Sequence, residues 1–210
     1  MTEKTCDTVP VWKVKFFEEL ERDKKAQLGR LGLPEHALSA LDTSKQTPAL
    51  QKIAEPFGIL VLSGTPGTGK TVAAVAWIAE YVNDTANWTE PGTAPRLKSR
   101  PPVFTTASEL ARWDRYEQES IHGLLRAPRL VIDDVGAEYL DKNGFYAALL
   151  DEVINVRYSA RLPVLLTTNI LSADEFRNRY GDRIAGRIRE SGRFSSCGGV
   201  DLRRAGGRAA

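Results

Sequence analysis

The stretch Gly-Thr-Pro-Gly-Thr-Gly-Lys-Thr at residues 64–71 decides the fold of this chain. It matches the pattern G-x-x-x-x-G-K-[S/T], and its flanks are equally informative. The short apolar run at residues 58–62 predicts a buried parallel strand, and the alanine-rich run at residues 72–82, free of Gly and Pro, predicts a helix. A strand, a glycine-rich loop and a helix in this order favour a phosphate-binding loop over a plain turn.

Every residue of this loop is a candidate for nucleotide binding. These are Gly64, Thr65, Pro66, Gly67, Thr68, Gly69, Lys70 and Thr71. The glycines allow the backbone N–H groups to face a phosphate chain, and the helix N-terminus adds positive potential. Lys70 is expected to be a solvent-facing charge at the loop tip that reaches the β- and γ-phosphates, and the Thr71 hydroxyl is expected to bind Mg²⁺.

Two further apolar runs end in polar side chains. The run Leu-Val-Ile at residues 130–132 leads into Asp133 and Asp134, and the run at residues 163–168 leads into Asn169. Ligand groups lie at the carboxyl ends of parallel strands, so Asp133 is a candidate Mg²⁺ ligand and Asp134 a candidate to orient or deprotonate water. Asn169 is a candidate to hold that water or the γ-phosphate. The alternatives are two acids in a turn and an asparagine that caps one.

Composition predicts one soluble, cytoplasmic domain with a small appendage. The chain has 210 residues, 42% of them hydrophobic and 27% charged, and its two cysteines, Cys6 and Cys197, have no spacing typical of a zinc site or a disulfide framework. No apolar run approaches membrane-spanning length, so no membrane partner is expected. The basic C-terminal stretch suits an anionic partner, although a solvated tail explains it nearly as well.

The chain divides at a polar link into two predicted parts. Residues 1–47 form a helical N-terminal extension for partner binding, and residues 48–210 form an ATPase core with a basic C-terminal segment. The extension is too small for a large core of its own, so we expect it to pack on the domain that follows. Residues 83–102 read as a surface loop. Cations and aromatics alternate over residues 112–116, a composition used to grip single-stranded nucleic acid, although helical packing of Trp113 explains part of it.

Taken together, these motifs resemble those of the AAA+ ATPases, and more narrowly of the DnaC/IstB-type helicase loaders and transposition ATPases. The matching segments are residues 31–34, 64–71, 130–136, 157–158, 167–169 and 180–188. The resemblance covers roughly residues 31–203. It implies an α/β fold: an αβα sandwich around a central parallel five-stranded sheet, with a short helical N-terminal segment and no separate lid domain.

The resemblance also implies functional roles. It implies ATP and Mg²⁺ as cofactors and a homo-oligomer in which each site lies between neighbouring subunits. Asn169 takes the position of sensor 1. Arg187 takes the position of an arginine finger acting in trans, with Arg183 the less favoured candidate, and Arg203 falls near the position of a sensor 2 arginine.

The sequence departs from the family pattern at two informative places. The acid after Asp133 is Asp134, where most AAA+ proteins have Glu. The cysteine-rich zinc cluster found at the N-terminus of some helicase loaders is missing, which leaves partner recognition unassigned.

The leading functional hypothesis is an ATPase that loads a replicative helicase onto single-stranded DNA. The first alternative is a transposition regulator that acts on duplex DNA with a transposase. The second alternative, from another class, is a P-loop small-molecule kinase, which does not account for residues 167–169 or the Arg187 region. The sequence does not name the partner, the preferred DNA structure or the size of the oligomer.

Overall fold

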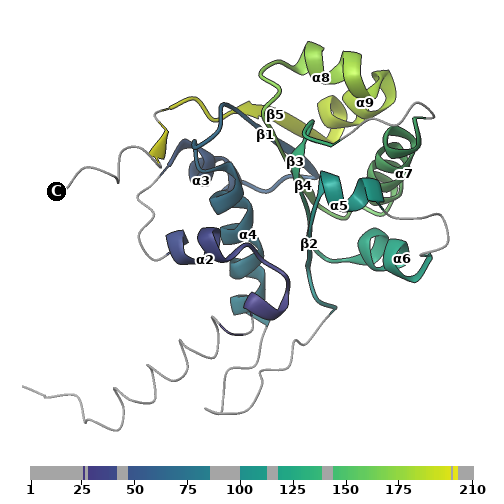
Figure 1. The fold of residues 1–210 in the computed structure, drawn as a ribbon. Helices are drawn as coiled ribbons and strands as arrows, with labels where there is room; N and C mark the ends of the chain where they lie inside the picture. Colours follow the sequence, from purple (N-terminus) through teal and green to yellow (C-terminus); the bar gives the residue numbers. More distant parts are fainter. Residues whose placement is uncertain are drawn as a thin grey trace, which may run out of the picture.

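The fold is built on a five-stranded parallel sheet (Figure 1). The computed structural model describes residue 26 and residues 28–41, 47–85, 100–112, 118–138, 144–199 and 201–202. The strands are β1 (Ile59–Ser63), β2 (Val103–Thr106), β3 (Leu130–Val135), β4 (Val164–Thr168) and β5 (Gly192–Ser196), in the spatial order β2-β3-β4-β1-β5. The predicted α/β class and the five parallel strands are confirmed.

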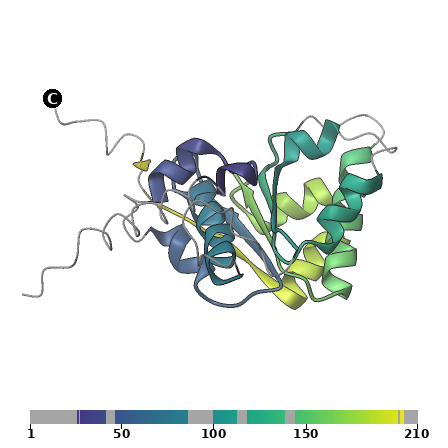
Figure 2. The same cartoon turned by 90° about the horizontal axis from the view of Figure 1, so that it is seen from below.

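Helices cover both faces of this sheet, so the domain has three layers (Figure 2). Their bounds are α2 (Glu35–Leu41), α3 (Pro48–Ile53), α4 (Lys70–Thr85), α5 (Ala107–Arg112), α6 (Gln118–Arg126), α7 (Phe145–Ser159), α8 (Ala173–Tyr180) and α9 (Asp182–Ser191). Helices α2, α3 and α4 lie on one face, and α5 to α9 lie on the other. Parallel strands require such crossovers, and these bury both faces of the sheet.

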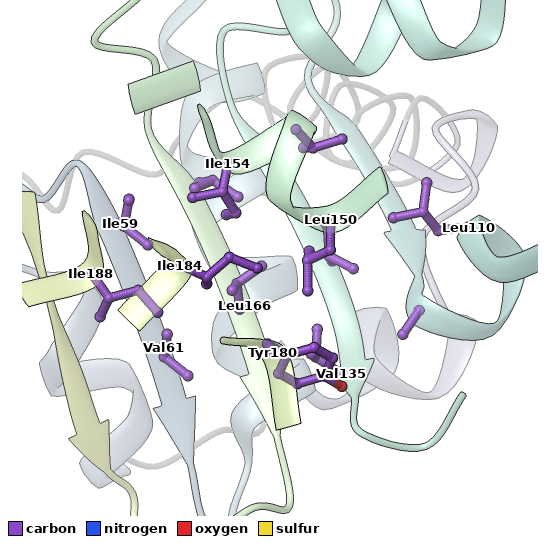
Figure 3. Packing of buried hydrophobic residues seen from close by; sticks show 14 of the residues in the cluster. Ile59, Val61, Leu110, Val135, Leu150, Ile154, Leu166, Tyr180, Ile184 and Ile188 are labelled. Carbon is purple, nitrogen blue, oxygen red and sulfur yellow. The ribbon is translucent and has the colours of Figure 1, made fainter. Parts of the chain in front are cut away.

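The alternation of side chains along the strands creates two cores. In β1, Ile59 and Val61 point into the core under α5 to α9, whereas Leu60 and Leu62 point into the core under α4. Figure 3 shows the first of these cores. Burial on both sides explains why the run that precedes the phosphate-binding loop is continuously apolar rather than alternating.

The N-terminal segment shares the second core. Leu33, Ala37 and Leu38 are buried with the residues of α4, and α2 packs on α4. The expectation that this segment packs on the following domain is confirmed for residues 28–41. The aromatic residues Trp12, Phe16 and Phe17 of this segment lie outside the described residues.

A buried arginine joins the loops at the amino ends of the strands. Arg157, on α7, donates hydrogen bonds to the carbonyl oxygens of Leu124 and Ala127 at 2.7 and 2.9 Å and of Pro163 at 2.5 Å. Burial without a carboxylate partner lowers the pKa of Arg157 to about 10. These contacts give Arg157 a structural role, which is to join the segments that precede β3 and β4.

The described helices include none that is long and apolar enough to cross a membrane.

Candidate active site

The phosphate-binding loop joins the carboxyl end of β1 to the first residue of α4. Gly67 and Gly69 have φ values of 85° and 84°, a left-handed conformation that other residues adopt only with strain. Because α4 begins at Lys70, the N–H groups of its first turn and the positive end of its dipole lie directly behind the loop. The loop therefore has the conformation and potential that bind an anion.

Lys70 is not the solvent-facing charge that we expected from the sequence. Its side chain is buried, with 6% of the residue exposed. The Nζ atom donates to the carbonyl oxygens of Gly64 at 2.7 Å and Thr65 at 2.9 Å, and to Oδ1 of Asn169 at 3.0 Å. A buried ammonium needs such acceptors, and the curled loop supplies two of them from its own backbone.

Asp133 and Thr71 meet as predicted. The Thr71 hydroxyl lies 3.2 and 3.1 Å from the two carboxylate oxygens of Asp133, at the carboxyl end of β3. A third residue, Thr167 on β4, donates to Oδ1 of Asp133 at 2.5 Å. The sequence does not predict this contact of Thr167, because nothing in a strand sequence says which hydroxyl faces the neighbouring strand.

These oxygen atoms suit Mg²⁺. A hydroxyl and a carboxylate are hard ligands, and Mg²⁺ is usually held by one or two carboxylates, substrate phosphates and water. The part of the chain that the structure describes contains no cluster of three or more His, Cys, Asp or Glu side chains that could hold a metal by itself. The pair Thr71 and Asp133 therefore fits a cation that arrives with a nucleotide.

Burial makes the ionised form of the Asp133 carboxylate energetically unfavourable in the nucleotide-free protein. Loss of hydration raises the pKa of the Asp133 carboxyl above its ordinary value of 3.8, and the charge of Asp134 raises it further. Hydrogen bonds from Thr167 and Thr71, and the charge of Lys70, act in the opposite direction. Loss of hydration is the largest of these effects. The positive charge of a bound cation would compensate for it by stabilising the ionised carboxylate.

Replacing Asp133 with asparagine is expected to raise the melting temperature of the nucleotide-free protein at neutral pH by a few degrees. Because the pKa of Asp133 is raised in the folded state, stability falls as pH rises from 3.8 through the raised pKa, and it stays lower above it. Asparagine has no ionisable carboxylate, so this pH-dependent loss of stability should disappear. Thermal melts from about pH 4 to pH 8 in the presence of a chelator measure the difference.

Asp134→Asn is the matched control, because Asp134 is an exposed neighbour. Because burial raises the pKa of Asp133 more than the charge of Asp134 does, Asp134→Asn should raise the melting temperature less than Asp133→Asn does. If Asp133→Asn melts at or below the wild-type temperature at neutral pH, the carboxylate of Asp133 is not destabilising.

Asp134 lies at an irregularity of the sheet. The register between β3 and β4 shifts between Ile132 and Val135, and Asp134 has a φ of 56°. Its N–H group donates to the Thr167 hydroxyl at 2.9 Å, while its side chain is exposed. Such bulges re-aim side chains beside active sites, and this one turns a carboxylate out of the strand next to Asp133.

Asn169 completes the site from the end of β4. It accepts a hydrogen bond from Lys70, and the Gly64 N–H group donates to the carbonyl oxygen of the preceding residue, Thr168, at 3.2 Å. The ends of β1, β3 and β4 are thus joined by direct contacts. Lys70, Thr71, Asp133 and Asn169, predicted separately from the sequence, lie in one constellation.

The two predicted arginines lie on α9, and both pair with Asp151 of α7. Nη1 of Arg183 lies 3.1 Å from Oδ2 of Asp151, and Nη1 of Arg187 lies 3.5 Å from Oδ1. The Arg183 side chain is 69% exposed, whereas that of Arg187 is 18% exposed and lies over the ring of Tyr158. The prediction favoured Arg187, which is the more covered of the two.

The chain returns to the phosphate-binding loop after β5. The Leu202 N–H group donates to the carbonyl oxygen of Gly67 at 3.0 Å. A Cβ atom added at Gly67 would lie 1.8 Å from Oδ1 of Asp201, so a larger residue would displace that side chain, and the φ of 85° also favours glycine. Arg203, the predicted sensor 2 residue, follows directly but lies outside the described residues, as does Trp113.

Comparisons with known proteins agree with this geometry at the level of fold. No protein-family model matches the chain, and no curated protein matches it. Among solved structures, the DnaC helicase loader is similar with a TM-score of 0.57 and 20% identity, over 79% of this chain and 100% of the other. DnaI is similar with a TM-score of 0.54 and 20% identity, over 74% of this chain and 80% of the other.

The replication initiator DnaA bound to AMPPCP and single-stranded DNA is also similar, with a TM-score of 0.51 and 15% identity. That likeness covers 78% of this chain and 46% of the DnaA chain. The chain therefore has the same fold as these solved structures, and the predicted resemblance is confirmed at the level of the fold.

Proposed function

We propose that this chain binds and hydrolyses ATP. The observation that carries the proposal is the convergence of Lys70, Thr71, Asp133 and Asn169 at the ends of β1, β3 and β4. No single one of these residues is specific, but together they supply a cation for phosphates, two magnesium ligands and a polar group at the γ-phosphate. A DnaA structure of the same fold contains the ATP analogue AMPPCP.

In the proposed reaction, the loop amides and Lys70 bind the β- and γ-phosphates. Lys70 would exchange its contacts with loop carbonyls for phosphate oxygens. Thr71 and Asp133 would hold a Mg²⁺ ion, which would supply positive charge next to the phosphates. Asp134, exposed beside this position, would orient or deprotonate the attacking water, and Asn169 would hold that water or the γ-phosphate.

The proposal includes assembly of several copies of the chain. Negative charge on the transferring phosphoryl group favours a cation supplied from outside the site. Arg187 is the proposed source in a neighbouring copy, and Arg183 on the same helix is the alternative. Nη1 of Arg187 is buried beside Asp151, so contact with a phosphate oxygen of a neighbouring copy would require this ion pair to open.

We further propose that the ATPase loads a replicative helicase onto single-stranded DNA. Support comes from two solved structures with this fold, a DnaC helicase loader and a DnaA bound to single-stranded DNA. Residues 1–47 would serve partner binding and residues 48–210 would form the ATPase core. The second candidate is a transposition regulator that acts on duplex DNA, supported by the sequence resemblance alone.

Binding to DNA separates these two candidates. We expect ATP-dependent binding to a single strand that is stronger than binding to duplex of equal length, with a steep dependence on salt. A loader must hold exposed bases, on which aromatic side chains stack. On duplex, contacts go mainly to the backbone. Fluorescence anisotropy with both oligonucleotides at matched salt, with ATP and with ADP, measures the preference.

The variant Trp113→Ala adds a test at the level of one residue. If the ring stacks on bases, the change weakens single-strand binding; if the ring is part of a core, it lowers the melting temperature instead. A clear ATP-dependent preference for duplex would overturn the loader proposal in favour of the transposition regulator.

A further inference from the structure

A buried carboxylate follows the candidate active site on the turn after β3. The Glu138 side chain is 0% exposed, and the proposed reaction gives it no role. Burying an ionised carboxylate is strongly unfavourable unless partners replace its hydration. The identity of those partners therefore shows what this charge holds in place.

The partners come from two different elements. Within the turn, the Gly136 N–H group donates to Oε2 of Glu138 at 2.7 Å. From the end of α8, the Tyr180 hydroxyl and Nη2 of Arg179 donate to Oε1 at 2.6 and 3.1 Å. Both carboxylate oxygens are thus used, one for the turn and one for the helix.

On the turn side, these contacts hold an unusual backbone. Asp134 has a φ of 56° and Gly136 a φ of 106°, and the Ala137 N–H group closes the turn onto the carbonyl oxygen of Asp134 at 3.0 Å. A residue other than glycine keeps a left-handed conformation only where its surroundings enforce it. The direction of the Asp134 carboxylate depends on this backbone, so it depends on the group that anchors the turn.

On the helix side, Tyr180 is itself firmly placed. It belongs to the core shown in Figure 3 and is 6% exposed. Its ring centroid lies 4.7 Å from that of Phe176 and 6.3 Å from that of Tyr146. The end of α8 is therefore fixed by core packing, and Glu138 can anchor the turn to it.

We propose that Glu138 is a positioning residue for hydrolysis: it holds the Asp134 turn against the end of α8, so that turnover rather than nucleotide binding depends on it. This inference rests on the proposed ATPase activity. The carboxylate of Glu138 pairs with Gly136, Arg179 and Tyr180, to which the proposed reaction gives no part in phosphate binding, so nucleotide affinity should survive its loss. The orientation of the Asp134 carboxylate, which the turn sets, should not survive this loss, so hydrolysis should slow.

Two tyrosines of the same core provide a matched test. Tyr180→Phe removes a hydroxyl that donates to Glu138, whereas Tyr146→Phe removes a buried hydroxyl that makes no hydrogen bond within the described residues. Both changes keep the ring and its packing. We expect Tyr180→Phe to lower kcat about tenfold, as loss of a hydrogen bond to a charged group does, with KM and ATP affinity changed less than about threefold. Tyr146→Phe should leave kcat within about twofold of wild type.

Glu138→Gln should lower kcat more, by about 10- to 100-fold, because both anchors weaken. Turnover is measured together with the stoichiometry of ATP binding, which counts folded sites, so unfolding cannot imitate a loss of kcat. If Glu138→Gln does not fold, the tyrosine pair decides.

Two negative results are distinguishable. A wild-type protein that binds no ATP or does not hydrolyse it overturns the proposed function, and the inference with it. A wild-type protein that hydrolyses ATP, with Tyr180→Phe turning over as fast as Tyr146→Phe, overturns the role of Glu138 alone.

Discussion

Replacing Lys70 with alanine should lower ATP affinity by at least about 100-fold, because each charge-assisted hydrogen bond contributes about 1.5–3 kcal/mol and 1.4 kcal/mol is a factor of ten. The ammonium of Lys70 donates hydrogen bonds to two carbonyl oxygens of the phosphate-binding loop. Its ammonium would have to turn only from those oxygens to the phosphates, so the site is organised before the nucleotide arrives. Titration with a fluorescent nucleotide measures the loss.

The buried position of Lys70 adds a consequence for stability. Removing the side chain leaves the acceptors on Gly64, Thr65 and Asn169 without this donor, so a lower melting temperature should accompany the loss of binding. Lys52→Ala, which removes an exposed lysine from α3, should change neither quantity. Unchanged nucleotide affinity in a folded Lys70→Ala protein would remove the assignment of the loop.

Replacing Arg187 with alanine should lower the rate of ATP hydrolysis by about 10³-fold or more while ATP binds nearly normally, as expected where a finger arginine stabilises only the transition state. The site of action should lie in a neighbouring copy. Mixing Arg187→Ala protein with Lys70→Ala protein should therefore restore part of the turnover, since the first contributes an intact phosphate site and the second an intact arginine. Steady-state hydrolysis at a fixed total concentration measures this.

Arg183→Ala serves as the comparison, because both arginines share Asp151. Arg187 also packs over Tyr158, so its loss should lower the melting temperature more than the loss of the more exposed Arg183. A large loss of turnover in Arg183→Ala but not in Arg187→Ala would move the finger to Arg183. Mixtures as inactive as their components, under conditions in which wild-type protein assembles, would contradict action in trans.

The sequence alone predicted the parallel αβα fold, which the structure confirms, and the residues of the candidate phosphate site. Glycines that permit left-handed φ angles, an apolar run buried on both faces and polar residues at strand ends are properties of contiguous residues. Parallel strands then bring their carboxyl ends to one edge whatever their spacing along the chain, so Thr71, Asp133 and Asn169 converge by topology. The strand β5 was implied only by resemblance, because the segment Gly192–Ser196 lacks a strand-like apolar pattern.

Only the tertiary structure decided which polar side chains form hydrogen bonds with one another. Lys70 is separated from Asn169 by 99 positions, Thr167 from Asp133 by 34 and Tyr180 from Glu138 by 42. Whether such groups meet depends on strand register and helix packing, which no local pattern encodes. For that reason the burial of Lys70, the bridging hydroxyl of Thr167 and the covered position of Arg187 became apparent only in the folded chain. A buried charge is stable only with its partners in place, and packing of the whole domain supplies them.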